Sequence, residues 1–310
     1  MTYRFDPELA AVIPAIPAVG ISDLAAARAG LDELSAQAGA NVDTGGVVIE
    51  DRLVPASAGH SIPIRVYAPT EREGRLPGVL YIHGGGFVLG SVDTEHAGAV
   101  LLARSVGAVV VSVDYRLAPE HPFPAGLDDC YDTLTWMRDG ADQLEVDLDR
   151  LAVFGNSAGG GLAAAVALLA RDRGGPSLCF QYLGIPELDD RLETVSMQTF
   201  VDTPMWNRPN AELSWQHYLG DDRSEVSPYA APARATDLSG LPPTYISTME
   251  FDPLRDEGLI YGLRLLQAGV TVELHQYPGT FHGSALVFTA ATSVRQSAET
   301  MDVMQRALHG

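Results

Sequence analysis

A serine in a glycine-flanked segment is the residue of this sequence best placed to act as a nucleophile. The segment Gly155-Asn156-Ser157-Ala158-Gly159 has the pattern G-x-S-x-G. It follows the apolar run 151–154 and opens the alanine-rich stretch 160–170, which predicts a strand–turn–helix junction. There the serine hydroxyl would stand above a sheet and point at a substrate carbonyl, with the Ala158 N–H facing the oxygen that becomes negative. The pattern therefore indicates acyl transfer.

A second glycine segment supplies further candidates for stabilising that oxygen. His83-Gly84-Gly85-Gly86 ends an apolar strand predicted over 79–82. Glycine-rich loops of this kind leave backbone N–H groups unpaired, so they can donate to an oxyanion. His83 is expected to hold the shape of the loop.

The serine needs a general base, and a histidine beyond the last predicted strand is the best candidate. Where this elbow occurs, the chain order is serine, then acid, then histidine. Of eight histidines, His282 lies in the segment 278–283, just after the strand predicted over 271–277. His275 lies inside that strand, where a structural role is expected.

The acid that orients the base should follow the strand predicted over 243–248. Asp252 lies on such a loop, and Pro253 stiffens the chain directly after it. Glu250, Asp256 and Glu257 are the alternatives. The last two are expected to lie in the first turn of a helix, where carboxylates interact favourably with the helix dipole.

These residues require a framework of alternating strands and helices. Long apolar strands such as 108–113 indicate burial on both faces, as in a mainly parallel sheet covered by helices. The predicted strands are 47–54, 61–68, 77–83, 108–114, 151–155, 178–184, 243–248 and 271–277. The predicted helices are 94–106, 125–140, 158–172, 255–268 and 284–307.

Two segments interrupt or precede this alternation and are predicted to form a helical cap. Residues 1–45 have apolar residues at helical spacing, and residues 186–230 are rich in aromatic, proline and polar residues without a strand pattern. The α/β core would then comprise residues 46–185 and 231–310.

Composition excludes several classes of chemistry and partner. All 20 basic residues of the 310-residue chain are arginines, so Schiff-base, pyridoxal phosphate, Walker A and Ser–Lys mechanisms have no lysine to use. The formal charge of −20 makes nucleic acid and anionic membrane surfaces poor partners. Cys130 and Cys179 are expected to be buried and reduced. Without a signal peptide or a long apolar span, cytoplasmic localisation is expected.

The chain resembles the hormone-sensitive-lipase family of bacterial esterases, a branch of the α/β hydrolases. The resemblance lies in the motifs HGGGF (83–87), DYRLAPEHPFPA (114–125), GNSAGG (155–160), DPLRDEG (252–258) and FHG (281–283). It implies a catalytic triad of Ser157, Asp252 and His282. It also implies an oxyanion hole formed by the N–H groups of Gly84, Gly85 and Ala158, no metal or other cofactor, and a helical cap.

One position departs from the family pattern. Asn156 precedes the serine where many relatives carry Asp or Thr, which leaves the hydrogen bonding of the elbow open. The segments 187–197 and 241–258 resemble a member that cleaves acetyl esters of a bulky alcohol, which favours short acyl groups.

Three function classes remain to be compared. A serine carboxylesterase is the principal hypothesis, and an amidase or deacetylase with the same triad is the alternative. A non-catalytic small-molecule receptor is disfavoured because such receptors of this family typically lose the triad histidine, whereas this chain keeps His282. The last predicted strand, 271–277, would be an uncovered edge, so a homodimer is possible.

Overall fold

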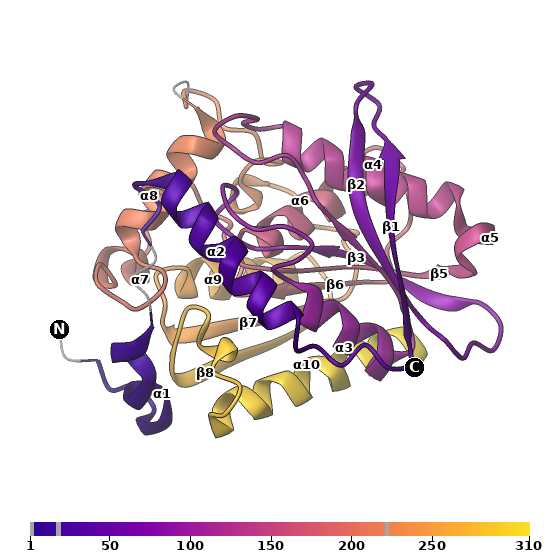
Figure 1. The fold of residues 1–310 in the computed structure, drawn as a ribbon. Coiled ribbons are helices and arrows are strands. Elements are labelled where there is room, and N and C mark those ends of the chain that lie inside the picture. Colours follow the sequence, from indigo (N-terminus) through magenta and orange to yellow (C-terminus); the bar gives the residue numbers. More distant parts are fainter. Residues whose placement is uncertain (1–2, 17–19, 221–222) are drawn as a thin grey trace.

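An eight-stranded sheet lies between two layers of helices in the computed structural model of this chain, which describes residues 3–16, 20–220 and 223–310 (Figure 1). The remaining positions of the predicted cap segments, 1–2, 17–19 and 221–222, lie outside the described residues. The strands are β1 (Val47–Pro55), β2 (Ser61–Pro69), β3 (Leu76–Ile82), β4 (Val109–Val113), β5 (Val146–Asn156), β6 (Phe180–Gly184), β7 (Thr244–Phe251) and β8 (Val272–Phe281).

The strand order is β1-β2-β4-β3-β5-β6-β7-β8. The two pairings of β2 are antiparallel, and all pairings from β4 to β8 are parallel. The predicted fold class, a mostly parallel sheet flanked by helices, is confirmed. Because parallel strands end at the same edge, the loops after β3, β5, β7 and β8 are brought close together, and these loops carry the predicted site.

Alternate residues of the central strands enter two separate cores. In β3, Val79 and Tyr81 pack under α3 (His96–Val106) and α10 (Ala291–His309). Leu80 and Ile82 face the other side. This alternation is the period-two pattern expected of a strand buried on both faces. The helices of the second side are α4 (Ala125–Asp139), α6 (Ala158–Asp172) and α9 (Arg255–Gln267), and the short α5 (Ala141–Leu144) precedes β5.

The two predicted cap segments contain helices. The first holds α1 (Pro7–Val12), a 3₁₀ turn at Ile13–Ala15 and α2 (Leu24–Gly39). The second holds α7 (Val195–Thr199) and α8 (Arg208–Leu219), and its described part has no strand. Figure 1 shows α2 crossing in front of the sheet and α8 at the same end of the molecule.

The last helix begins later than its sequence pattern predicts. Residues Ser284–Leu286 form a short 3₁₀ turn, and α10 starts at Ala291 rather than near 284. The Glu8 carboxylate accepts a hydrogen bond from the Ala291 N–H at 2.6 Å, so a contact from the other end of the chain fixes the start of this helix.

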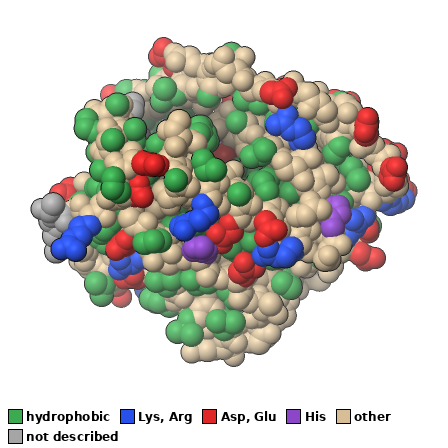
Figure 2. All heavy atoms as spheres, turned by 90° about the horizontal axis from the view of Figure 1, so that it is seen from below, with side chains coloured by type: hydrophobic (Ala, Val, Ile, Leu, Met, Phe, Trp, Pro, Cys, Tyr) green, Lys and Arg blue, Asp and Glu red, His purple; other side chains and the backbone are tan. Residues whose placement is uncertain are grey.

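The two cysteines differ in burial, and the charged residues on the surface are mixed. Cys130 is buried and free, whereas Cys179 is free but only partly buried, contrary to the expectation for the second thiol. On the face seen in Figure 2, arginine side chains lie among carboxylates and apolar groups, with no basic patch. None of the helices in the described ranges is long and apolar enough to cross a membrane.

Candidate active site

Ser157 lies at the junction of β5 and α6 in a conformation that is rare for a residue with a side chain. Its φ is 57° and its ψ is −125°. The two flanking glycines make the turn possible, because a Cβ on Gly155 would lie 2.1 Å from the Gly159 carbonyl oxygen. A Cβ on Gly159 would lie 2.1 Å from the carbonyl oxygen of Ile82. The predicted strand–turn–helix context is therefore present, and strain of this kind is typical of functional residues.

Asn156, the position that departs from the family pattern, packs against β6. A Cβ on Gly184 would lie 1.9 Å from the Asn156 Oδ1, so the missing side chain of Gly184 makes room for it. The Gly184 carbonyl also accepts the Ser157 N–H at 2.8 Å. The elbow is thus held against the neighbouring strand.

The predicted nucleophile, base and acid lie in one hydrogen-bonded row. The His282 Nε2 is 2.9 Å from the Ser157 Oγ, and its Nδ1 is 2.7 Å from the Asp252 Oδ2. All three side chains are nearly inaccessible to solvent, with 9%, 7% and 0% exposure for the serine, histidine and aspartate. The Leu254 N–H donates to the Asp252 Oδ1 at 2.9 Å, which fixes the carboxylate. The geometry suits proton transfer from serine to histidine.

The alternative acids have other partners. Glu250 accepts the Gly279 N–H at 2.6 Å and so braces the loop that leads to His282. Asp256 pairs with Arg255 at 2.8 Å in the first turn of α9. Glu257 also lies in the first turn of α9, as expected, and it is buried, at 2% exposure.

Glu257 is buried because it closes the loop after β6. Its Oε1 accepts the N–H groups of Leu188 and Asp189, at 2.6 and 3.3 Å. Burial raises the pKa of this carboxyl well above its ordinary value.

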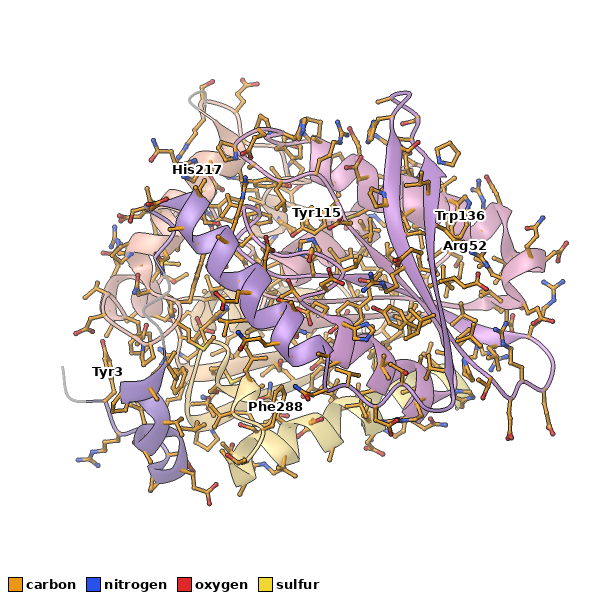
Figure 3. All side chains as sticks on the ribbon, viewed as in Figure 1. Tyr3, Arg52, Tyr115, Trp136, His217 and Phe288 are labelled. Carbon is orange, nitrogen blue, oxygen red and sulfur yellow. The ribbon has the colours of Figure 1, made fainter. Side chains whose placement is uncertain are left out.

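Two other histidines have structural surroundings, as the sequence predicts. The Nδ1 of His275 contacts Glu299 at 2.5 Å, and its ring stacks on Tyr277. His83 is fully buried, stacks on Tyr115, and has its Nδ1 2.8 Å from the Gly84 carbonyl (Figure 3 labels Tyr115 within the fold). Burial lowers the pKa of His83 to about 4, so this imidazole is neutral at neutral pH.

The glycine loop (residues 83–86) lies directly against the elbow. A Cβ on Gly84 would be 2.9 Å from the Asn156 carbonyl oxygen and 3.4 Å from the Ser157 Cβ, so only glycine fits. Burial raises the pKa of the Glu95 carboxyl group, and a hydrogen bond from the Gly84 N–H partly opposes this shift. Within the described residues, no hydrogen-bond acceptor is found for the N–H groups of Gly85 and Ala158. These two donors are therefore free to meet an oxyanion, while Gly84 is partly engaged.

A buried glutamic acid connects the glycine loop to α8, and no local sequence pattern identifies it. The Ser214 Oγ, on α8, lies 2.9 Å from the Gly86 carbonyl oxygen and 3.0 Å from the Glu187 Oε1. A serine hydroxyl has one hydrogen, and a carbonyl oxygen cannot donate. Both contacts are hydrogen bonds only if Glu187 is protonated and donates to Ser214. Burial raises the pKa of Glu187 to about 8, which is consistent with a neutral side chain at neutral pH.

A cavity of about 500 Å³ opens over the serine and is bounded by α2. Trp206 and Leu286 line it, whereas Phe87, directly after the glycine loop, packs in the core and stacks on Tyr218 at 4.0 Å. The wall is largely apolar, which suits an uncharged acyl or aryl group.

Charged side chains of the DYRLAPEHPFPA segment form ion pairs that brace the neighbouring loops and α2. Arg116 forms a two-pronged ion pair with the buried Asp129, at 2.9 Å. Glu120 pairs with Arg28 of α2 at 2.6 Å, and Arg28 also donates to the Ala118 carbonyl at 2.9 Å. The cap helix is thereby attached beside the glycine loop.

Comparison with known proteins identifies relatives over most of the chain. The family model described as alpha/beta hydrolase fold matches residues 79–286. Carboxylesterase NlhH of Mycobacterium tuberculosis is 45% identical over 269 residues, which cover 84% of this chain and 83% of that protein. An arylesterase of Saccharolobus solfataricus is 39% identical over 228 residues, or 72% of each protein. Among solved structures, bacterial heroin esterase matches with a TM-score of 0.97 and 52% identity over 99% of both chains.

Proposed function

The chain belongs to the α/β-hydrolase fold family, in its hormone-sensitive-lipase-like branch, and is a carboxylic ester hydrolase; we propose that it works through Ser157, His282 and Asp252. The observation that carries this proposal is the row of hydrogen bonds through His282, with 2.9 Å to the serine and 2.7 Å to the aspartate. The strained serine at the strand–helix junction supports it.

In the proposed acylation step, neutral His282 takes the Ser157 proton while the hydroxyl attacks the ester carbonyl. Asp252 holds the imidazole with its Nδ1 protonated and stabilises the imidazolium that forms. Negative charge on the carbonyl oxygen is met by the N–H groups of Gly85 and Ala158, with Gly84 as the third proposed donor. Each such donor typically contributes about 3 kcal/mol to transition-state stabilisation. The alcohol leaves with the proton from His282.

In the proposed deacylation step, water replaces the alcohol. His282 removes a proton from the water as it attacks the acyl-enzyme, and then returns that proton to the Ser157 oxygen. The products are a carboxylic acid and free enzyme. Every proton in the cycle is carried by the same imidazole.

The proposed substrates are short-chain acyl esters, in particular acetyl esters of bulky or aromatic alcohols. The apolar cavity and its partial enclosure by α2 support a small acyl group and a larger alcohol. The names of two relatives, an arylesterase and a heroin esterase, are in line with this preference. The described residues on the face seen in Figure 2 form no basic amphipathic patch of the kind that binds lipid interfaces.

A panel of nitrophenyl esters from two to sixteen acyl carbons tests this proposal, with a nitroanilide included for amide cleavage. We expect the largest kcat/KM between acetyl and butyryl, and much slower anilide cleavage. A maximum at ten carbons or more would overturn the acyl preference. Faster cleavage of the anilide would favour the amidase alternative, and no turnover of any ester would favour a receptor.

We further propose that a second copy of the chain is its partner, paired along β8. This strand is an edge of the sheet. Unpaired edge strands commonly bind another strand, so the edge is a plausible dimer interface.

A further inference from the structure

The wall of the active-site cavity includes polar side chains that the proposed acyl transfer does not use. Most of the cavity wall is glycine, aliphatic or aromatic. Among the described residues that line it there is no arginine. Apart from the proposed triad, its acidic and amide side chains are Asp23, Glu95, Asn156 and Gln296. Two of these, Glu95 and Gln296, have unused hydrogen-bonding capacity.

Gln296 lies on α10, and among the described residues its side-chain amide has no hydrogen-bond partner. Its side chain lines the cavity, and the residue is 8% exposed. Only its backbone carbonyl, which accepts from Thr300, forms a hydrogen bond beyond the helix ladder within the described residues. Its amide atoms are not among the buried polar atoms that lack a partner, so they are reached from the open cavity and can bind a ligand there.

Glu95 lies at the N-cap of α3 but does not cap the helix. Its Oε2 accepts the Tyr81 hydroxyl at 2.9 Å, and the Gly84 N–H is its other polar neighbour. An ionised carboxylate has about four acceptor sites, so two donors leave capacity for more. No described basic side chain pairs with Glu95, and burial raises the pKa of its carboxyl. A half-buried carboxylate without a counter-ion is best stabilised by a cation.

The two side chains are fixed on the same side of the sheet. They come from α3 and α10, which pack together there (Figure 1). Below them a row of stacked rings runs from Tyr81 to Tyr182. The Tyr81 hydroxyl holds Glu95, and the Tyr182 hydroxyl holds Thr300, one turn after Gln296. The aromatic row thus forms a rigid base for both groups.

We propose that Glu95 and Gln296 form a subsite for a protonated amine carried by the ester substrate, an inference that rests on the proposed esterase function. An ammonium N–H donates to the Glu95 carboxylate, and the Gln296 carbonyl oxygen accepts from the same cation. Asp23 adds a second negative charge to the cavity wall. The formal charge of −20 favours the approach of cations to the cavity.

Two matched alcohols test the subsite in the unaltered enzyme. 2-Aminoethanol is protonated at neutral pH and its primary ammonium can donate to both groups, and 1-propanol has nearly the same shape without charge. Both are measured as competitive inhibitors of phenyl acetate hydrolysis, so differences in ester reactivity do not enter. We expect the cation to bind about ten- to hundredfold more tightly, as for a hydrogen bond to a charged group. Equal inhibition constants would overturn the proposal.

Variants then assign the preference to residues. Glu95→Gln removes the charge and keeps the shape, and we expect it to reduce the ratio of the two inhibition constants at least about tenfold. Gln296→Leu should reduce the ratio less. The control is Glu33→Gln, which removes one charge from an exposed position of α2 outside the cavity wall and should keep the wild-type ratio. An unchanged ratio in Glu95→Gln would refute the assignment.

The outcomes also separate the subsite from the esterase proposal. If the wild type does not hydrolyse phenyl acetate, the proposed function fails. If it hydrolyses phenyl acetate and binds both alcohols equally, only the subsite fails. If Glu95→Gln does not fold, as judged by circular dichroism, the two inhibition constants of the wild type still test whether the subsite exists.

Discussion

At the scale of single residues, Ser157 concentrates the proposed chemistry. Its hydroxyl contacts His282, whereas its strained backbone conformation is set by the turn between β5 and α6. Removal of the hydroxyl should therefore leave the turn unchanged. We expect Ser157→Ala to fold normally and to lose about 10⁴- to 10⁶-fold in turnover. Ester hydrolysis and circular dichroism measure the two effects.

A phosphonate that reacts with activated serines provides the control for this variant. We expect mass spectrometry to find the label on Ser157 alone in the wild type and nowhere in Ser157→Ala. Labelling of another serine, or substantial activity in the variant, would mean that the elbow does not carry the nucleophile.

Asp252 is expected to act by selecting the tautomer of His282. An amide in its place can donate to the Nδ1, which then leaves the proton on the Nε2 and blocks its use as a base. We expect Asp252→Asn to lower kcat by about 10⁴ without unfolding. Asp256→Asn is the matched control, because that carboxylate pairs with Arg255 in α9. If the control were the more damaging change, the acid would have to be reassigned.

Glu187 gives the molecule a pH-dependent stability. Its pKa is raised from 4.5 to about 8 by burial, so the folded chain holds this proton more tightly than the unfolded chain. The stabilisation is complete below about pH 4.5 and is lost as the pH rises through about 8. Glu187→Gln cannot ionise but can still donate to Ser214. We therefore expect the melting temperature of the wild type to fall more steeply between about pH 5 and 8 than that of the variant.

The quantity to measure is the difference between the melting-temperature profiles of wild type and Glu187→Gln across pH. The difference isolates Glu187, because neighbouring groups also affect its pKa. The charge of Asp252 raises its pKa, Ser214 lowers it, and Glu187 in turn raises the pKa of the nearby Glu257. Parallel melting profiles for wild type and Glu187→Gln would show that Glu187 is ionised in the fold.

The sequence predicted the triad candidates and missed the groups that support them, for a physical reason. Ser157, Asp252 and His282 each follow a strand in a short segment with glycine or proline, so local patterns identify them. The surroundings of Glu187 and Gln296 are formed by residues far away in the chain, so no local sequence pattern identifies their roles. The burial of Glu257 likewise depends on distant partners, the N–H groups of Leu188 and Asp189.

At the scale of elements, α2 is held over the cavity by one arginine. Arg28 donates to the carbonyls of Val88 and Ala118, both at 2.9 Å, and pairs with Glu120. We expect Arg28→Met to keep the apolar stem, lose these bonds and destabilise the attachment of α2 by about 1–3 kcal/mol. Hydrogen exchange over residues 24–39 should become faster, and KM for aryl esters should rise.

The control for this prediction is an arginine on the surface. Arg52 pairs with Glu50 on β1 with both side chains exposed, and exposed pairs contribute about 0–1 kcal/mol. Arg52→Met should leave hydrogen exchange of α2 unchanged. If Arg28→Met behaved in the same way, α2 would be held by its apolar contacts alone.

The strands were predictable to within a few residues, and the boundaries that differ depend on distant contacts. β5 extends back to Val146 because Leu76 and Pro77 of β3 pair with Val146 and Asp147. The start of α10 depends on Glu8, at the opposite end of the sequence. Local periodicity carries no information about either contact, whereas it identified the buried central strands directly.

At the scale of the whole molecule, the two edges of the sheet differ in what they offer a second copy. β1 carries Glu50, Asp51 and Arg52 in succession, and charged residues on an edge strand oppose pairing. The β8 edge has an apolar neighbour in α9, where Leu263 is 55% exposed and Ile260 49%. Leu274 of β8 itself is 38% exposed. The β8 edge is therefore the better candidate for an interface.

We expect sedimentation velocity to give a dimer at micromolar concentration, and Leu263→Glu to shift it towards monomer, because a buried unpaired carboxylate opposes association. Leu53→Glu is the matched control, since Leu53 lies on β1 at the other edge and is 67% exposed. It should leave the dimer intact. A dimer that dissociates with Leu53→Glu and persists with Leu263→Glu would assign the interface to β1, and a monomeric wild type would refute pairing at either edge.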